Sequence, residues 1–424
     1  MTPPIATAPE PISRAAWALL LFMTLLNVLN HVDRWLLSGL APLIIAELGL
    51  SKTEIGLLVG FGFVFFYSLV GMFLGVAADR WPRIPLLMGG VALWSAMTAA
   101  SGLARSFVHL AIPRILVGVG EATLTPAALS MLGDAIPRRR LGLATGVYYA
   151  GIPLGTATSL IVAGFVAPRW GWRACFFALG TVGLLAVLAL RLFREPARTG
   201  GNVAAAHPPL GTLVRDFGRA LAERRQLLLV LAGGSCLVFG AGAALHNVTW
   251  LVEERGLPFA RAAFIAGVMA VTAGFLGNLA GGMFGDWLGR RVPNGRLWSL
   301  VAMTLFFVPA TALFYLLPAG TPLFFVCWFI AQAGYSSWFG PLFAAIQELS
   351  PQHTRSTVVA FALLVMNLLG VGPGPLITGM IGDARDLTSG LVASLGVVAA
   401  AIVPFAVAAR VRQATAAPAE AAAT

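Results

Sequence analysis

Four ionisable residues lie in long stretches that are otherwise almost uncharged: Asp33, Arg34, Arg114 and Glu121. On a helix of 3.6 residues per turn, Arg114, Gly118 and Glu121 share one face, with about 10 Å of rise from the arginine to the carboxylate. Carboxylates and guanidinium groups held away from water can exchange protons or bind an anionic group, because burial disfavours every unpaired charge. The alternative is a fixed ion-pair network that only joins two helices.

The residues around Asp33 and Arg34 are also polar. Asn27, Asn30 and Arg34 fall on one helical stripe, whereas Asp33 lies about 100° away around the helix and faces a different neighbour. His31 could relay protons at neutral pH, or it could simply make a satisfied hydrogen bond.

The elements that position these residues are membrane-spanning helices. Hydrophobic residues make up 58% of the 424 residues and charged residues 11%, far below the roughly 25% charged residues of soluble domains. Several uncharged runs reach the ~20 residues that cross a bilayer. We therefore predict an all-α polytopic membrane protein with twelve transmembrane helices, near residues 16–45, 54–78, 84–104, 108–134, 141–167, 173–193, 226–252, 260–285, 297–317, 321–348, 356–382 and 388–409.

An internal repeat predicts two halves. Gly75, Asp79 and Arg83 recur 207 positions later as Gly282, Asp286 and Arg290, and such duplicated helix sets are typical of transporters. We expect a cytoplasmic N-terminus (1–15), a six-helix bundle (16–193), a cytoplasmic linker (194–225), a second six-helix bundle (226–411) and a disordered tail (412–424).

Charge predicts the orientation. Most of the 28 Lys and Arg residues fall in the loops that lie inside when the N-terminus is inside, and positive charge favours the cytoplasmic side. Both termini are therefore expected in the cytoplasm. Within the linker, apolar residues from Leu210 to Leu221 recur at helical spacing, which predicts either an amphipathic helix on the inner leaflet or a solvated linker helix.

The repeated segment resembles the signature loop of the major facilitator superfamily. The first copy has Asp79, Arg80 and Arg83, with Pro82 where that family usually has glycine, and the second has Asp286 and Arg290. A carboxylate at a helix end with flanking arginines can pair in one state and separate in another, so these residues predict a conformational latch. The alternative is that the charges only anchor the loops at the membrane surface.

A narrower resemblance is carried by Asn30-His31-Val32-Asp33-Arg34, by Arg114 with Gly120-Glu121-Ala122, and by Tyr149 with Ile152-Pro153-Leu154-Gly155. Together these segments resemble the Spinster family within the major facilitators. The resemblance implies transport of lysophospholipid or sphingolipid-like amphiphiles, with protons as coupling ions. It makes Asp33, Arg34, Arg114 and Glu121 the candidate coupling and substrate residues. Asp33 and Glu121, together with His31 from its residue type, are the candidates for proton coupling.

The C-terminal half has no ionisable residue of this kind within its apolar runs, and it offers aromatic surface instead. A charged wall opposite an apolar wall suits an amphiphile with a polar head and an apolar tail. The expected substrate-binding residues are Asn27, Asn30, Arg34, Arg114, Tyr149, Tyr335, Trp338, Phe339 and Asn367.

Other functions are disfavoured by what the sequence lacks. Cys175, Cys236 and Cys327 all lie in apolar segments without metal-ligand spacing, and no nucleophile or phosphate-binding motif indicates an enzyme. The net charge of +11 is spread over the loops rather than gathered for nucleic acid. We expect no cofactor, a monomer in the bacterial inner membrane, and contact with membrane lipids. The alternative transport functions are symport of a small organic anion and drug/proton antiport.

Overall fold

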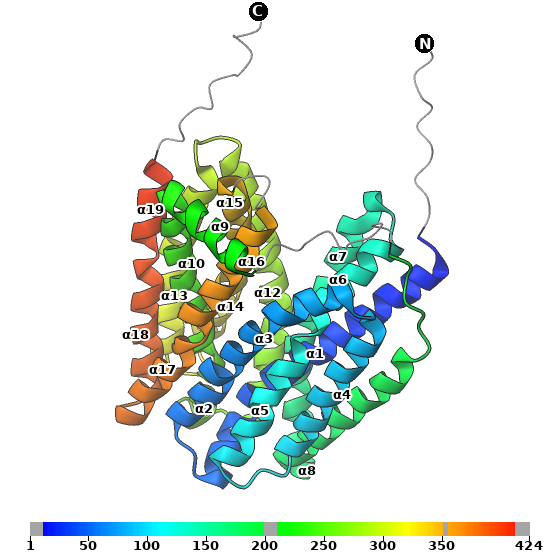
Figure 1. Cartoon of the computed structure of the whole chain (residues 1–424). Helices are drawn as coiled ribbons and strands as arrows, with labels where there is room; N and C mark the ends of the chain where they lie inside the picture. Colours follow the sequence, from blue (N-terminus) through cyan, green and yellow to red (C-terminus); the bar gives the residue numbers. More distant parts are fainter. Residues whose placement is uncertain (1–11, 199–209, 351–354, 412–424) are drawn as a thin grey trace, which may run out of the picture.

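The computed structural model describes residues 12–198, 210–350 and 355–411, and within these ranges the chain is helical, with no strand. The start of α1 and the end of α19 lie at the same end of the molecule (Figure 1), here called the terminal end, and the opposite end is the far end. The helices are α1 (Arg14–Leu48), α2 (Lys52–Val59), α3 (Phe61–Arg80), α4 (Arg83–Ser101), α5 (Phe107–Glu121), α6 (Leu124–Ala135), η1 (Arg138–Arg140), α7 (Leu141–Tyr149), α8 (Gly151–Leu190), α9 (Leu210–Glu223), α10 (Arg225–Ala243), η2 (Ala244–His246), α11 (Asn247–Glu253), α12 (Phe259–Gly289), α13 (Gly295–Leu316), α14 (Pro322–Ser337), α15 (Phe339–Leu349), α16 (Arg355–Met366), η4 (Asn367–Val371), α17 (Pro373–Ala384), α18 (Leu387–Ala400) and α19 (Ile402–Arg410).

Ten stretches of the described residues are long and apolar enough to cross a membrane. One of them, Leu141–Leu190, has 50 residues, more than twice the ~20 that a bilayer requires. Gly171 interrupts it with a φ of 78° and a ψ of 162°, between the expected helices at 141–167 and 173–193. The expected helix at 321–348 corresponds to α14 and α15, which are separated at Trp338.

Several expected helices are interrupted where a neighbouring backbone comes close. The break at Gly60 separates α2 from α3, and a Cβ there would come within 2.5 Å of the carbonyl oxygen of Gly372. Gly56, one turn earlier, would place a Cβ 2.3 Å from the carbonyl oxygen of Pro375. Side chains at these two positions would push α2 away from α17, so the glycines explain how segments far apart in sequence pack here.

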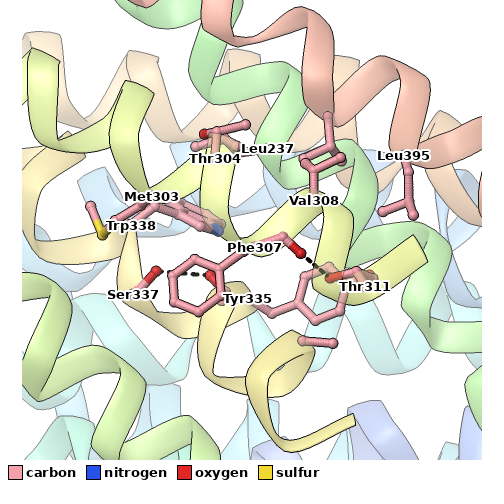
Figure 2. A pocket seen from close by; sticks show the side chains of 13 residues that line it. Leu237, Met303, Thr304, Phe307, Val308, Thr311, Tyr335, Ser337, Trp338 and Leu395 are labelled. Atoms are coloured by element: carbon pink, nitrogen blue, oxygen red, sulfur yellow. Dashed lines mark hydrogen bonds between the residues drawn. The ribbon is translucent and has the colours of Figure 1, made fainter. Parts of the chain in front are cut away.

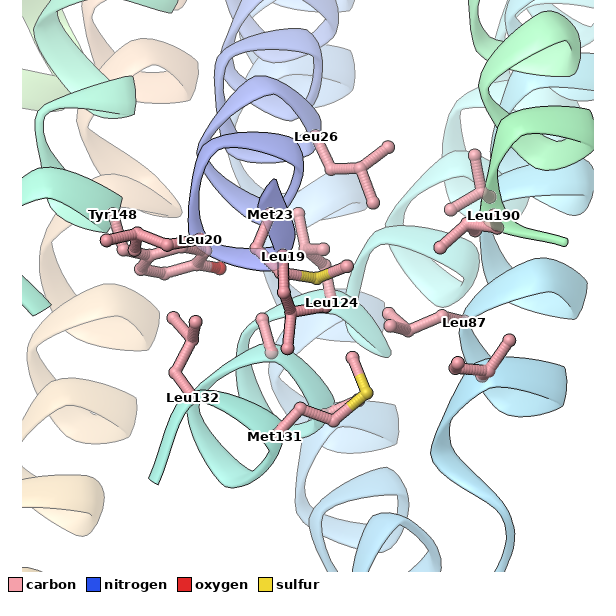
Figure 3. Packing of buried hydrophobic residues seen from close by; sticks show 14 of the residues in the cluster. Leu19, Leu20, Met23, Leu26, Leu87, Leu124, Met131, Leu132, Tyr148 and Leu190 are labelled. Carbon is pink, nitrogen blue, oxygen red and sulfur yellow. The ribbon is translucent and has the colours of Figure 1, made fainter. Parts of the chain in front are cut away.

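The N-terminal core lies at the terminal end of the first helices. Figure 3 shows Leu19, Met23 and Leu26 of α1 packed with Leu87 of α4 and Met131 of α6. These side chains are fully or almost fully buried. A corresponding cluster of α10, α13, α15, α16 and α19 forms the core of the C-terminal helices.

The first group of helices (α1–α8) and the second group (α10–α19) contact each other toward the far end. The side chain of Asp383 at the end of α17 accepts hydrogen bonds from the backbone N–H groups of Lys52 and Thr53, at 2.9 and 2.8 Å. The ammonium group of Lys52 lies 3.3 Å from a carboxylate oxygen of Glu253. Ser38 of α1 also donates a hydrogen bond to the carbonyl of Leu245.

Helix α9 packs on the second group of helices. Phe217, on its apolar face, is buried and its ring stacks on that of Phe361 in α16, with centroids 5.0 Å apart. This part of the apolar face therefore packs on the protein. The expected N-terminal segment (through residue 11) and the expected tail (412–424) lie outside the described residues.

Candidate functional site

Helix α1 brings its polar residues close to α8 because α8 has glycines at the contact. A Cβ on Gly155 would come within 2.5 Å of the carbonyl oxygen of Val28 and 2.6 Å of the Cβ of His31. At this contact the amide of Asn27 donates to the carbonyl of Tyr148 at 2.8 Å, and Nδ1 of His31 lies 3.0 Å from the carbonyl oxygen of Asn27.

The four buried charges form two crossed ion pairs between α1 and α5. A guanidinium nitrogen of Arg114 lies 3.5 Å from a carboxylate oxygen of Asp33, and both side chains are buried. Nε of Arg34 donates to Oε2 of Glu121 at 2.8 Å. The Glu121 side chain is fully buried, whereas that of Arg34 is 25% exposed. Each helix thus supplies one acid and one base, and the four charges sum to zero.

The Asp33 pair is the more enclosed one. Thr98 of α4 donates a hydrogen bond from its hydroxyl to the second carboxylate oxygen of Asp33. Arg114 also donates to the carbonyl of Arg34 at 3.0 Å, so its side chain is fixed to the α1 backbone as well as to the carboxylate. Sequence analysis did not include Thr98, since a single hydroxyl in an apolar helix carries no distinguishing signal.

Three buried polar atoms in this cluster have no hydrogen-bond partner among the described residues: Nδ2 of Asn30, Nε of Arg114 and Oε1 of Glu121. A buried polar group that makes no hydrogen bond destabilises the fold by about 1–3 kcal/mol. Each of these atoms is therefore able to accept or donate one more hydrogen bond.

The rings of two aromatic residues of α3 contact the guanidinium groups of both arginines, and the sequence analysis named neither residue. The guanidinium carbon of Arg34 lies 4.1 Å from the ring centroid of Tyr67 and 5.1 Å from that of Phe63, and that of Arg114 lies 4.5 Å from Phe63. Gly118 faces Phe63, since a Cβ on it would come 3.2 Å from the Phe63 carbonyl oxygen. The four-residue spacing of Phe63 and Tyr67 was the available signal, but α3 also carries Phe61, Phe65 and Phe66.

The expected C-terminal residues do not form one cluster with these charges. Tyr335 and Trp338 line a cavity of about 40 Å³ between α10, α13, α14 and α18 (Figure 2). The Trp338 ring is buried in the C-terminal core and stacks on Phe339, with centroids 4.1 Å apart. Phe339 itself is 45% exposed, and Asn367 begins the π-helical turn η4.

The polar groups near Tyr335 are neutral and bond to one another. The Tyr315 hydroxyl donates to Oδ1 of Asn247 at 3.0 Å and lies 3.2 Å from the Tyr335 hydroxyl. In the first group of helices, Tyr149 is 41% exposed and its ring packs edge-on against Tyr148, with centroids 5.2 Å apart.

In the first copy of the expected latch, Arg83 is buried. It donates to Glu195 at 2.8 Å and to Ser130 at 3.0 Å, and it also pairs with Asp134. Ser130 and Asp134 belong to α6, and Glu195 lies in the segment that follows α8. Asp79 and Arg80 are at the end of α3, and their side chains lie outside the described residues.

In the second copy the pairing residue is one that sequence analysis did not name. Arg296, near the start of α13, lies 2.9 Å from Asp286 and also pairs with Glu348. Arg290 directly follows the end of α12 and is exposed, and its backbone N–H donates to the carbonyl of Asp286 at 3.1 Å. Arg83 begins α4, whereas the corresponding position near the start of α13 is taken by Arg296, because the turn between α12 and α13 is longer than that between α3 and α4.

Comparison with known families gives the class of protein. Residues 23–375 match the Major Facilitator Superfamily, and the chain belongs to this superfamily of membrane transporters. Its members are transporters and not enzymes, and the expected all-helical major facilitator fold is confirmed.

The chain is also similar in sequence to individual transporters. The chain is 32% identical over 378 residues to an MFS-type efflux pump of Mycolicibacterium smegmatis, covering 88% of this chain and 85% of that protein. It is 29% identical over 392 residues to the hexuronate transporter of Bacillus subtilis, covering 88% and 89%. It is 26% identical over 381 residues to the sphingosine-1-phosphate transporter SPNS2 of Xenopus tropicalis, covering 84% and 72%.

A solved structure has a similar fold. The crystal structure of a bacterial homolog of the human lysosomal transporter Spinster, in an inward-facing and unoccupied conformation, matches with a TM-score of 0.84 at 24% identity. The match covers 94% of this chain and 98% of that one. The resemblance to the Spinster family is thus confirmed.

Proposed function

We propose that this chain is a secondary active transporter that moves an anionic amphiphile, lysophospholipid or sphingolipid-like, across the membrane in exchange with or together with protons. The observation that carries the proposal is the Arg34–Glu121 pair. The Arg34 side chain is 25% exposed, and the second carboxylate oxygen of Glu121 is buried without a partner among the described residues. One partner can therefore meet a ligand while the other has an atom left to take a proton.

The proposed coupling is a competition for Arg34. Protonation of Glu121 at Oε1 removes the charge that attracts the guanidinium, and the freed guanidinium then binds the phosphate or carboxylate of the substrate. Arginine suits this role because its planar group can donate two parallel hydrogen bonds to such an anion. A substrate anion and the ionised Glu121 exclude each other at Arg34, so proton uptake and substrate binding are linked.

Asp33 is the second proposed proton-coupling residue. It is held by Thr98 and Arg114, and it is enclosed more deeply than the Arg34 pair. His31 contacts the same stretch of α1 through the Asn27 carbonyl and is proposed to pass protons toward it. Asn27 and Asn30 border the head-group site, where the unpartnered amide nitrogen of Asn30 is a further donor for an anion.

The apolar tail of the substrate is proposed to lie along Tyr149 and Phe339, whose rings are partly exposed. Tyr335, Trp338 and Asn367 belong to the C-terminal wall of the same path. The name of the SPNS2 relative, a sphingosine-1-phosphate transporter, supports a substrate with a phosphate head and a long apolar tail.

The proposed architecture is twelve spans in two six-helix halves (16–193 and 226–411), with both termini in the cytoplasm of a bacterial cell and the chain acting as a monomer. Transport then requires the far-end contacts, such as that of Asp383 with α2, to open while the terminal ends close. In that closed state, the loops with Asp79, Arg80 and Arg83 and with Asp286 and Arg290 are proposed to act as the latch.

A second candidate function is supported by the names of two relatives, an efflux pump and a hexuronate transporter. It is symport of a small organic anion or drug/proton antiport. Both functions use the same four charges, so they differ in what fills the rest of the site.

Equilibrium binding to the purified protein separates these functions. Labelled lysophosphatidic acid is bound and then displaced with unlabelled lysophosphatidic acid, glucuronate or a cationic drug, in wild type and Arg34→Gln. Displacement by the amphiphile alone, lost in Arg34→Gln, is the expected result. Displacement by glucuronate at comparable concentration, or unchanged binding in the variant, would reject the amphiphile head-group site.

A further inference from the structure

A lipid-facing groove lies between α12, α13 and α14, away from the four buried charges. Its volume is about 420 Å³, and its walls are apolar except for Ser337. Small residues form the floor on α12, where Gly277 and Gly281 touch the backbone of α14, and phenylalanines form the sides. Because this surface would face the hydrocarbon of a bilayer, its occupant there is an acyl chain.

Cationic and aromatic residues lie directly beyond the groove at the terminal end. Phe284 lines the groove and its ring stacks on that of Trp287, with centroids 5.9 Å apart. The guanidinium carbon of Arg291 lies 4.5 Å from the ring centroid of Trp287. Tryptophan and arginine at the end of an apolar helix are typical of the membrane–water interface. Along α12, the groove from Leu276 to Phe284 rises by about 12 Å toward this end.

The charge at the end of the groove is available to a ligand. Arg291 is exposed and has no ion pair with a described residue. The nearby carboxylate of Asp286 is paired with Arg296 instead. An exposed, unpaired arginine above an apolar groove complements the phosphate of an anionic lipid, and basic pockets beside membrane helices on the cytoplasmic side bind such lipids.

We propose that this groove is a binding site for an anionic phospholipid of the bilayer, with one acyl chain between α12, α13 and α14 and the phosphate on Arg291 beside Trp287. The site is separate from the transport site of Arg34 and Glu121. It fixes the packing of α12 against α14, and α12 also contacts α8 of the other group of helices, where Gly267 meets the Ala157 carbonyl. Bound lipid therefore stabilises one face of the contact between the two groups.

The test measures thermal unfolding of the purified full chain in detergent with phosphatidylglycerol or with phosphatidylcholine of the same acyl chains. Native mass spectrometry counts the retained lipid. In wild type the anionic lipid is expected to bind more tightly, by about five-fold for a single arginine. Arg291→Gln removes this preference, whereas Arg105→Gln, an exposed arginine at the far end, keeps it.

Variants that fill the groove test the acyl-chain part of the site independently of Arg291. Ala280→Phe and Ala302→Phe each place a ring in the groove from an exposed position, and either one is expected to reduce retained phosphatidylglycerol. Gly89→Phe is the matched control, because it fills a groove of about 460 Å³ between α3, α4 and α5. Equal binding of the two lipids by wild type, or a preference that survives both Arg291→Gln and Ala280→Phe, would overturn the proposal. Displacement of the bound lipid by the transported amphiphile would overturn it as well.

Discussion

The two groups of helices differ in the charge of the polar clusters that they bury. Around α1 and α5, Asp33, Arg34, Arg114 and Glu121 form two ion pairs, and Nε of Arg114 and Oε1 of Glu121 have no partner among the described residues. Around α13 and α14, Tyr315 and its neighbours are neutral and bond to one another.

This difference indicates which of the two regions serves function. A buried ion pair usually stabilises a fold no better than apolar residues of the same size, whereas neutral hydrogen bonds each add a modest free energy of folding. The charged region is thus the one that packing alone does not explain. The predictions below compare the cost of disturbing each region.

Arg114→Ala is expected to have the largest effect on folding. It leaves the Asp33 carboxylate buried without its cation, and removal of one partner from a buried pair destabilises by about 3–5 kcal/mol. Chemical unfolding of the purified protein measures the loss. The double variant Asp33→Asn with Arg114→Ala removes both charges and should recover most of the stability. If Arg114→Ala unfolds like wild type, the pair has no energetic role.

Glu121→Gln tests whether ionised Glu121 competes with the substrate for Arg34. The amide keeps a hydrogen-bond acceptor for Nε of Arg34 but cannot ionise, so Arg34 stays available to an anion at every pH. In wild type, binding of lysophosphatidic acid should tighten as the pH falls and Glu121 takes up its proton. In Glu121→Gln it should stay tight at high pH, about ten-fold above wild type, as expected for a released charge-assisted hydrogen bond. Parallel pH profiles for the two proteins would contradict the competition for Arg34.

Tyr67→Leu tests the aromatic support of Arg34. Loss of the ring face removes a cation–π contact that contributes about 0.5–2 kcal/mol, so affinity for an anionic amphiphile should fall by about two-fold to about 30-fold. Tyr67→Phe keeps the ring and should retain most of the affinity. Phe73→Leu, an exposed position on the same helix, is the control. Equal losses in Phe73→Leu and Tyr67→Leu would show that only the helix surface matters.

Tyr315→Phe, in the neutral region, should have the smallest effect. It removes the hydroxyl that bonds to Asn247 and leaves the ring in place, which costs about 0.5–1.5 kcal/mol. Thermal unfolding should shift slightly, and the pH dependence of substrate binding should not change. A changed pH profile in this variant would place proton coupling in both groups of helices.

The charges could be predicted from the sequence, but their aromatic and hydroxyl partners could not. An ionisable residue inside an apolar run stands out by its type, so Asp33, Arg34, Arg114 and Glu121 were found, whereas which acid pairs with which arginine is seen only in the structure. Phe63 and Tyr67 were missed because the rotation of α3 about its axis depends on how Gly118 and its neighbours pack.

Helix continuity was likewise only partly predictable. Hydropathy located the apolar runs, yet it does not register the breaks at Gly60 and at Trp338. The break at Gly60 occurs where α2 packs on the backbone of Gly372 and Pro375, a long-range contact that has no local signal. The pairing of Asp286 with Arg296 also depended on the length of one turn, which a fixed repeat shift cannot describe.

The most direct test of the account is uptake of labelled lysophospholipid into proteoliposomes, with and without an imposed pH gradient, by wild type and Asp33→Asn side by side. An asparagine at this position cannot exchange a proton, so gradient-stimulated uptake should fall by about 10²-fold or more, while the variant remains folded. Full gradient-stimulated uptake by folded Asp33→Asn protein would contradict the proposal that Asp33 couples transport to protons, and full uptake by Glu121→Gln as well would contradict coupling by the buried charges of α1 and α5.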